Sequence, residues 1–163
     1  MTNTGEDFEA AYRDLFPRVA RIAFRLLGNR TAAEDVAAET LARAYAHWSR
    51  IGSAPYRDGW VLRVGTNLAI DTARRRPPNL ETVAALDSAE AATVRLALVS
   101  ALRTLPRRQR QAIVLRYLSG LRDDELPRAL GVSAGTASTH LRRGLDALRR
   151  RLGDDFREET LTL

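Results

Sequence analysis

Residues 123–143, DDELPRALGVSAGTASTHLRR, hold the pattern that decides the fold. Four apolar side chains recur at helical spacing on the two sides of a turn: Leu126, Leu130, Ala137 and Leu141. Gly131 lies between the two pairs, where a tight turn between helices needs a positive φ that glycine adopts without strain. Val132 can fill the core beneath that turn, and Ser133 is a residue type that commonly caps a helix. The stretch therefore predicts a helix-turn-helix.

The second helix of this motif would turn a polar face outward. Its outward positions are Thr136, Ser138, Thr139, Arg142 and Arg143. Hydroxyl and guanidinium groups hydrogen-bond base edges and phosphates when such a helix lies in the major groove of DNA. An ordinary helical hairpin can use the same turn, so the motif leaves a DNA-binding and a purely structural interpretation open.

Positive charge is concentrated around this motif. The whole chain has a formal net charge of +6, and all 26 basic residues are arginine. Residues 94–152 hold 13 arginines and four acidic residues, a net charge of +9, whereas residues 1–76 carry +3. The acidic segments 77–93 and 153–163 carry −3 each. A compact segment with this charge indicates a polyanionic partner, usually DNA, although a solvated arginine surface has the same composition.

Several kinds of site have no counterpart in the sequence. The chain has no cysteine and two histidines, His47 and His140, so neither a zinc site nor thiol chemistry is expected. It has no glycine-rich phosphate loop and no pairing of a nucleophile with a base, so we expect no catalytic residue, no metal and no cofactor. The polar start of the chain and the lack of an apolar run of ~18 residues predict a soluble, cytoplasmic protein without membrane insertion.

The first part of the chain has the periodicity of helices. Apolar residues within 8–26 recur every three or four positions, and Pro17 is expected to kink this helix or to begin a second one. Gly28 is a suitable helix end, and residues 31–34, TAAE, have the pattern of a capping box that begins the next helix. That helix would bury Ala37, Leu41, Ala44 and Trp48.

The remaining segments complete a two-domain pattern. Residues 50–58 predict a loop, and a helix from Trp60 would end at the arginines before Pro77. Helical periodicity resumes at Val94 and continues through the helix-turn-helix, with no strand pattern. The sequence therefore predicts an all-α protein of two small helical domains. They are residues 1–76 and 93–152, joined by a flexible, acidic linker, 77–92, and followed by an acidic tail, 153–163.

Two longer motif blocks resemble one protein family. LPRRQRQAIVLRYLSGL at 105–121, with LGVSAGT at 130–136, resembles sigma region 4, the promoter −35 reader of the sigma-70 superfamily. LLGNRTAAEDVAAET at 26–40 and WVLRVGTNLAID at 60–71 resemble region 2, the −10 reader. No further domain separates the two blocks, and in this respect the chain resembles the extracytoplasmic-function (group 4) sigma factors. The resemblance covers nearly the whole chain and implies a factor that binds core RNA polymerase and directs promoter recognition and transcription initiation.

The resemblance implies contacts with promoter DNA from both domains. In region 4 they would come from the outward helix and its cap: Ser133, Thr136, Ser138, Thr139, Arg142 and Arg143. In region 2 they would come from one helical stripe and its basic end: Arg63, Asn67, Arg74, Arg75 and Arg76. Arginines can neutralise phosphates, and an asparagine can reach a base edge. The loop at 50–58 would hold a base flipped from the non-template strand, with Tyr56 stacking on it.

Asp35 and Glu39 are four residues apart and share one helical face. The resemblance implies that this face binds the β′ coiled coil of core RNA polymerase. It also implies the polymerase β flap as a contact and an anti-sigma factor as a partner. By spacing alone, a solvated acidic face with Glu39 paired to Arg43 is the favoured interpretation.

Some residues depart from the family pattern. Pro127 stands where alanine is usual, and we expect it in the first turn of its helix, after Asp124 as N-cap, where its missing N–H costs little. Ala137 replaces a usual valine and Ser138 a usual basic residue, which weakens the expected core and DNA contacts. Gly65 stands mid-helix where alanine is usual, at a cost of about 1 kcal/mol.

Three other functions compete with this interpretation. A helix-turn-helix transcriptional regulator that acts without replacing the primary sigma factor is the main alternative, but residues 1–76 lack the alternating strands of a receiver domain. A helical protein that binds only other proteins is disfavoured by the charge of residues 94–152. An enzyme is the least supported, since no catalytic constellation is found.

Overall fold

The computed structural model describes residues 4–76, 89–153 and 156–162. All regular elements in these ranges are helical, as the sequence predicts, and none of these helices is long and apolar enough to cross a membrane. They are α1 (Thr4–Leu27), α2 (Arg30–Ala46), α3 (Trp48–Ile51), α4 (Arg57–Arg75), α6 (Ala89–Thr104), α7 (Arg107–Ile113), the π-helical η1 (Val114–Leu118), α8 (Leu126–Leu130), α9 (Ala134–Leu152) and the 3-10 helix η2 (Glu158–Thr162). Residues 77–88 of the predicted linker lie outside the described residues, and residues 89–92 are the start of α6.

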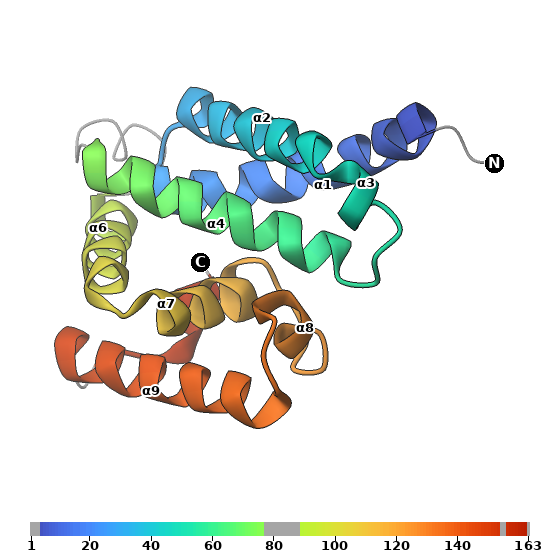
Figure 1. Cartoon of the computed structure of the whole chain (residues 1–163). Helices are drawn as coiled ribbons and strands as arrows, with labels where there is room; N and C mark the ends of the chain where they lie inside the picture. Colours follow the sequence, from blue (N-terminus) through green and yellow to red (C-terminus); the bar gives the residue numbers. More distant parts are fainter. Residues whose placement is uncertain (1–3, 77–88, 154–155, 163) are drawn as a thin grey trace.

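The first domain is built on α1, α2 and α4, which pack on one another (Figure 1). All three helices contribute fully buried apolar residues, among them Leu15, Val19, Leu26, Leu41, Leu62 and Ala69. Gly65 lies in the middle of α4, and a Cβ at this position would lie only 2.6 Å from Val19 Cγ1 and 3.4 Å from Thr40 Oγ1. The glycine that lowers the local helix propensity is therefore what allows the three helices to approach closely.

The ends of the first two helices differ in part from the prediction. α1 continues through Pro17, so this proline does not begin a second helix. Gly28 ends α1 with a φ of 63°, as predicted. The capping box predicted at residues 31–34 is wrong: Asn29 is the N-cap of α2, and its Oδ1 accepts a hydrogen bond from Ala32 N–H at 2.8 Å. Asparagine is among the strongest capping residues, so the helix begins two residues earlier than the threonine pattern indicates.

The loop predicted at residues 50–58 is shorter in the structure. α3 carries the chain to Ile51 and α4 begins at Arg57, which leaves residues 52–56 between them. Trp48 anchors this corner, because its side chain is buried and its ring meets the ring of Phe8 edge-on at 5.0 Å. The predicted packing role of Trp48 is confirmed.

The second domain carries the helix-turn-helix, α8 and α9, packed on α7 (Figure 1). Gly131 has a φ of 67°, as the predicted turn requires. Val132 N–H donates to the carbonyl of Pro127 at 3.1 Å, which closes the end of α8. Ser133 Oγ accepts a hydrogen bond from Thr136 N–H at 3.2 Å, so the predicted cap of α9 is confirmed.

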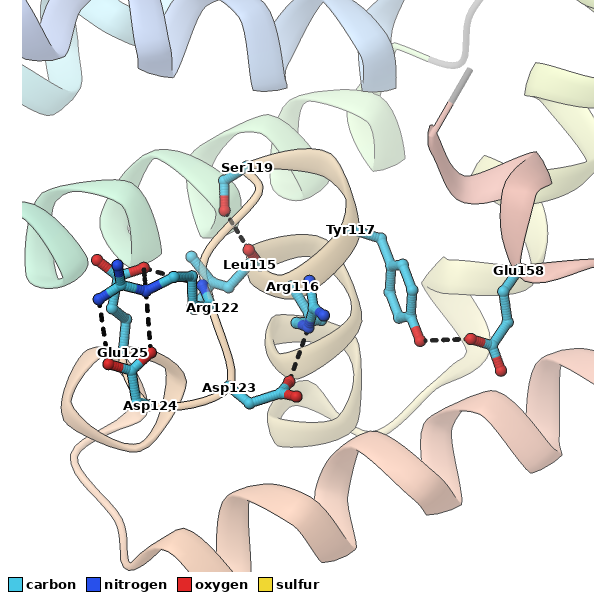
Figure 2. A network of polar contacts seen from close by, with 9 residues as sticks. All are labelled: Leu115, Arg116, Tyr117, Ser119, Arg122, Asp123, Asp124, Glu125 and Glu158. Carbon is cyan, nitrogen blue, oxygen red and sulfur yellow. Dashed lines mark hydrogen bonds and ion pairs between the residues drawn. The ribbon is translucent and has the colours of Figure 1, made fainter.

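The start of α8 differs by one residue from the prediction. Its N-cap is Glu125 and not Asp124, and Pro127 is the second residue of the helix, within the first turn as expected. Asp124 instead forms two hydrogen bonds with the guanidinium of Arg122, at 3.0 and 3.1 Å (Figure 2). The Glu125 carboxylate accepts a hydrogen bond from the Arg122 N–H at 2.9 Å. Arg122 thus organises the turn before α8, and its hydrogen bond lowers the pKa of Asp124.

The end of the chain folds back on the second domain. Glu158 accepts hydrogen bonds from Tyr117 Oη at 2.9 Å (Figure 2) and from Arg149 Nη2 at 2.8 Å. Leu161 in η2 is 1% exposed. Burial and the hydrogen bond to Glu158 raise the pKa of Tyr117 to about 12. Part of the predicted acidic tail is therefore a packed element of this domain.

The two domains pack against each other, which the sequence does not predict. α4 lies between the other helices of the first domain and α7, η1 and α8 of the second (Figure 1). The apolar cores of both domains form one continuous cluster. The contact between α4 and the second domain determines which of the predicted site residues are accessible.

Candidate nucleic-acid interface

The outer face of α9 is open to solvent. Four of its five predicted contact residues are exposed and Thr139 is half-buried; the exposed ones are Thr136, Ser138, Arg142 and Arg143. Neither of these two arginines has a hydrogen bond or an ion pair with another residue that the structure describes. Ala137, on the inner side, is 2% exposed. The helix therefore presents hydroxyl and guanidinium groups on one side and its apolar side to the domain.

The hydroxyl groups at the start of α9 take part in local hydrogen bonds. Ser133 Oγ donates to Thr136 Oγ1 at 2.9 Å while it caps the helix, and Thr139 Oγ1 donates to the carbonyl of Gly135 at 2.9 Å. A hydroxyl has one O–H donor and two lone pairs, so Thr139, which donates here, keeps both lone pairs, and Thr136, which accepts here, keeps one lone pair and its donor. Thr136 and Thr139 can therefore accept from base amino groups, whereas Ser133 is engaged through both roles by the cap.

The predicted DNA-contacting stripe of α4 faces the second domain instead of solvent. Asn67 Oδ1 accepts a hydrogen bond from Gln111 Nε2 at 2.8 Å, and Gln111 is 2% exposed. Arg63 Nη1 donates to the carbonyl of Leu130 at 3.1 Å. Ile70, three residues after Asn67 on the same helix, is buried in the core. In this arrangement of the domains, partners distant in the sequence occupy both side chains. Contact of Arg63 and Asn67 with DNA stays a prediction.

Two arginines meet at one carbonyl in this contact. Arg108 Nη1 donates to the Leu130 carbonyl at 2.8 Å, alongside Arg63. This carbonyl is at the end of α8, where unpaired carbonyl groups attract cations. Burial, and then repulsion from Arg108 and Arg107, lower the pKa of Arg63. The contact thus holds like charges together, and it depends on the Leu130 carbonyl to offset them.

The basic end of α4 stays accessible. Arg74, Arg75 and Arg76 are all exposed. Arg74 Nη2 lies 3.8 Å from Asp71 Oδ1, and Arg75 Nε donates to the carbonyl of Asp71 at 3.3 Å. Exposed arginines in such weak contacts can turn toward phosphates, as predicted for this end of the helix.

A cavity of about 630 Å³ separates the loop after α3 from the start of α8. Its lining comes from both domains and includes Tyr56, Arg57 and Asp58 on one side and Arg128 and Ala129 on the other. Tyr56 is 43% exposed, so its ring is available for stacking. A nucleotide that stacked on this ring would have to enter between the two domains.

Two family models match the two domains in the order expected. The model for Sigma-70 region 2 matches residues 11–77, and the model for Sigma-70, region 4, matches residues 95–148. The RNA polymerase sigma-E factor of Streptomyces coelicolor is 32% identical over 154 residues, which cover 90% of this chain and 86% of that protein. This chain belongs to the extracytoplasmic-function (ECF) sigma factors. The ECF RNA polymerase sigma factor SigW of Bacillus subtilis is also similar, at 29% identity over 168 residues that cover 91% of this sigma factor and 88% of that one.

A solved structure has the same fold as this sigma factor. It is the sigma factor RpoE from Bartonella quintana, in a complex with the anti-sigma factor NepR. The match has a TM-score of 0.57 and 21% sequence identity, and it covers 93% of this chain and 99% of that chain. At this identity the likeness shows the fold alone. The first domain is therefore region 2 and the second is region 4 of an RNA polymerase sigma factor.

The acidic face of region 2 lies on α2. Asp35 and Glu39 are both exposed, and Glu39 Oε1 accepts a hydrogen bond from Arg43 Nε at 2.8 Å. The simple surface pairing that the spacing favours is thus present. It leaves Asp35 and the second oxygen of Glu39 available to a partner, so this structure is compatible with both interpretations of the face.

Sequence reasoning missed the residues that join the domains of this sigma factor. Gln111 directly precedes the apolar run Ala112–Leu115, and its amide group was a signal, because a buried polar side chain needs a partner. Gly59 is a second missed residue, since a Cβ there would lie 2.7 Å from the Cβ of Ala129 in region 4. No local pattern marks Gly59, because its constraint comes from a residue 70 positions away.

Proposed function

We propose that this sigma factor binds core RNA polymerase in the cytoplasm and directs it to promoters, with region 4 on the −35 element and region 2 on the −10 element. The observation that carries the proposal is the exposed outer face of α9. It presents Arg142 and Arg143 without partners among the described residues, on a helix whose start is fixed by a cap and a tight turn. Such a helix suits the major groove. The factor would act by binding alone and would not be an enzyme.

Each domain would contribute a distinct set of contacts. Region 4 would use Thr136, Ser138, Thr139, Arg142 and Arg143, with Ser133 holding the helix start. Region 2 would use Tyr56 for a flipped base, Arg63 and Asn67 for the −10 duplex, and Arg74, Arg75 and Arg76 for phosphates. Asp35 and Glu39 would bind arginines of the polymerase β′ coiled coil, because carboxylates accept charge-assisted hydrogen bonds from guanidinium groups. The β flap would contact region 4.

An anti-sigma factor is a further proposed partner. The Bartonella quintana structure of the same fold is a complex with such a protein. A protein that held this sigma factor away from polymerase would have to cover the surfaces named above. Co-purification of a protein with the tagged sigma factor, and loss of run-off transcription when that protein is added, would support this partner.

Run-off transcription tests the proposal directly. Core RNA polymerase would be combined with this protein on fragmented DNA of its own genome, and the transcripts sequenced. We expect discrete transcripts with a shared sequence upstream, absent when either component is omitted. The variant Arg142→Ala/Arg143→Ala should lose most of them. The matched control is Arg150→Ala/Arg151→Ala, which removes two exposed arginines from the far end of the same helix.

The same assay separates the main alternative. A regulator that acts without replacing the primary sigma factor would give no transcript with core polymerase alone. It would change transcript levels only when holoenzyme carrying the primary sigma factor was supplied. That outcome would overturn the proposed function.

A further inference from the structure

A short segment after α9 inserts one leucine into region 4. It comprises residues 156–162, the tail segment, whose helical part is η2. η2 packs on η1, and Leu161 is 1% exposed. Leu161 belongs to the same apolar cluster as Leu118 of η1, and Phe156 is half-buried against that cluster. Region 4 therefore offers an apolar receptor for a leucine from a short segment.

A carboxylate three residues before this leucine is bound as well. One oxygen of Glu158 accepts a hydrogen bond from Tyr117 Oη at 2.9 Å (Figure 2), and the other accepts one from Arg149 Nη2 at 2.8 Å. The side chains of Arg149 and Glu158 are 49% and 45% exposed, so water screens their ion pair and it holds the segment only weakly. The part of region 4 that η2 covers, on η1 and the last turn of α9, is the η2 site. It binds a carboxylate and a leucine.

The η2 site belongs to the part of region 4 that the family shares. The model for Sigma-70, region 4, matches residues 95–148, which include the whole of η1. The tail segment lies beyond that match, after Gly153, where a φ of 86° marks the end of α9. The tail segment is therefore an occupant of the domain and not part of its shared core.

The η2 site is separate from the DNA-binding face proposed for α9. Arg142 and Arg143 stay exposed while the tail segment is in place, because Arg149 is near the far end of the helix from the cap at Ser133. Region 4 can thus hold DNA and a peptide segment together. Residues 94–152 carry a net charge of +9, which favours a segment with carboxylates.

We propose that the η2 site is the place where core RNA polymerase contacts region 4, through an acidic, leucine-bearing segment of the β flap, and that the tail segment is a stand-in which this segment displaces. The inference rests on the proposed function, which has the β flap contact region 4. The tail segment is covalently attached and is therefore present at a high effective concentration. It covers an apolar surface in the free factor and sets the affinity that a polymerase segment must exceed.

Two perturbations act on the tail segment in opposite directions. Leu161→Asp removes the buried anchor and releases the segment, with Arg157→Ala, at an exposed position of the same segment, as the control. Arg149→Cys/Glu158→Cys places two cysteines where the native side chains meet at 2.8 Å, in a chain that has no other cysteine. A short bismaleimide then cross-links the pair and holds the segment in place. Circular dichroism and the affinity for −35 duplex DNA confirm that region 4 stays folded.

Biolayer interferometry measures the affinity of each form for core polymerase. Leu161→Asp should bind on the order of tenfold more tightly than the wild type, because a site that is open for only part of the time binds with an apparent affinity reduced by the open fraction. The cross-linked protein should bind on the order of tenfold more weakly than the uncross-linked form of the same variant, for the same reason. Arg157→Ala should equal the wild type.

The proposal is overturned when Leu161→Asp binds polymerase no more tightly than the wild type, and also when the cross-linked and uncross-linked forms bind equally. Should Leu161→Asp unfold, the comparison of the two cross-linking states decides alone. Failure of the proposed function is distinct, since wild-type protein with core polymerase would then give no run-off transcript. Run-off transcription together with equal affinities of all forms would leave the function standing and refute the docking role of the η2 site.

Discussion

Arg142 and Arg143 are neighbours on α9. The salt dependence of DNA affinity, measured for each single variant, can show whether each contacts a phosphate or a base. Both are exposed and follow the part of the helix nearest its cap. We expect them to contact phosphates, since side chains this far along a helix in the major groove are moving away from the bases.

The single variants Arg142→Ala and Arg143→Ala should weaken the binding of −35 DNA by region 4, and by the same factor whichever base pair of that DNA is substituted. Each lost phosphate contact should reduce the slope of log affinity against log salt by about 0.9. Fluorescence anisotropy over a salt series measures this slope, with Arg150→Ala as the control on the same helix. A loss of about 1–3 kcal/mol at one base pair only would show a base contact instead.

Tyr117 and Glu158 make a pH-dependent link between η1 and the end of the chain. The pKa of Tyr117 is raised from 10.0 to about 12, first by burial and then by the hydrogen bond to Glu158. The folded state therefore favours the neutral phenol. The stabilisation is complete below the ordinary pKa and is lost as the pH rises from about 10 to about 12.

Glu158→Gln should lower the pKa of Tyr117 toward its ordinary value, because the nearby negative charge is removed. The difference in ultraviolet absorbance between Tyr117-containing protein and its Tyr117→Phe counterpart, followed against pH, reports this group alone. An unchanged pKa in Glu158→Gln would mean that burial alone holds the phenol neutral.

The sequence predicted the face of the helix on which a residue lies, but not its partner in the other domain. The inner and outer sides of α9 followed from spacing, and Ala137 and Arg142 lie as predicted. Arg63 and Asn67 were placed on the correct helix and in the correct register, but their partners were not predictable. A hydrogen bond between Asn67 and Gln111 depends on how two domains meet, and no local pattern encodes that.

The turn between α8 and α9 offers a test of whether its glycine is needed for a positive φ, because a second glycine lies four residues away in a regular helix. Gly131 has a φ of 67°, and Gly135 lies in the first turn of α9 with open space around it. Gly131→Ala should destabilise the protein by about 1–2 kcal/mol, because the left-handed conformation strains an L side chain.

Gly135→Ala is the matched control and should stabilise the protein by up to ~1 kcal/mol, since it lowers the entropy of the unfolded chain without a clash. Urea denaturation followed by circular dichroism measures both differences. Destabilisation of similar size in the two variants would show that the positive φ of Gly131 is not what the turn requires.

The acidic face of α2 is the element that tests polymerase binding. Asp35→Ala/Glu39→Ala removes two exposed carboxylates and one surface ion pair, that of Glu39 with Arg43, so stability should change by no more than about 0.5 kcal/mol. Affinity for core polymerase should fall about tenfold or more, because each hydrogen bond to a charged group contributes about 1.5–3 kcal/mol.

Biolayer interferometry with immobilised core polymerase measures this affinity. Glu34→Ala is the control, because Glu34 is an exposed carboxylate of the same helix that pairs with Arg30 at 3.0 Å. Equal affinity of the double variant and the wild type would leave this face as solvated surface.

Element boundaries were predicted to within a few residues where a cap or a glycine marked them. Gly28, Gly131 and Ser133 are such positions. The prediction failed where two signals competed, as with Asn29 and Thr31 at the start of α2. Asn29 won because its side chain reaches Ala32 N–H, an outcome of geometry that residue types alone do not rank.

At the scale of the whole molecule, the division into two helical domains followed from periodicity and composition and their order from the family resemblance, whereas their packing was not predicted. Both domains have cores made by residues close in the sequence, which periodicity can detect. The interface between them joins positions such as Gly59 and Ala129, and Asn67 and Gln111, which are separated by the whole linker. Residues 94–152 carry a net charge of +9 and residues 1–76 carry +3, and the Leu130 carbonyl helps to offset the repulsion between arginines of the two domains.

The fit of Gly59 against Ala129 has a consequence for inheritance. Neither position can carry a larger side chain while the other keeps its place, so homologues that retain this packing of the two domains have to keep both residues small. Neighbouring surface positions have no such steric constraint, so their residues can change independently. Among descendants of a common ancestor, a larger side chain at one of the two positions should therefore mark branches in which the two domains no longer pack in this way. The identities of these two residues in related sequences would then show where this packing arose and where it was lost.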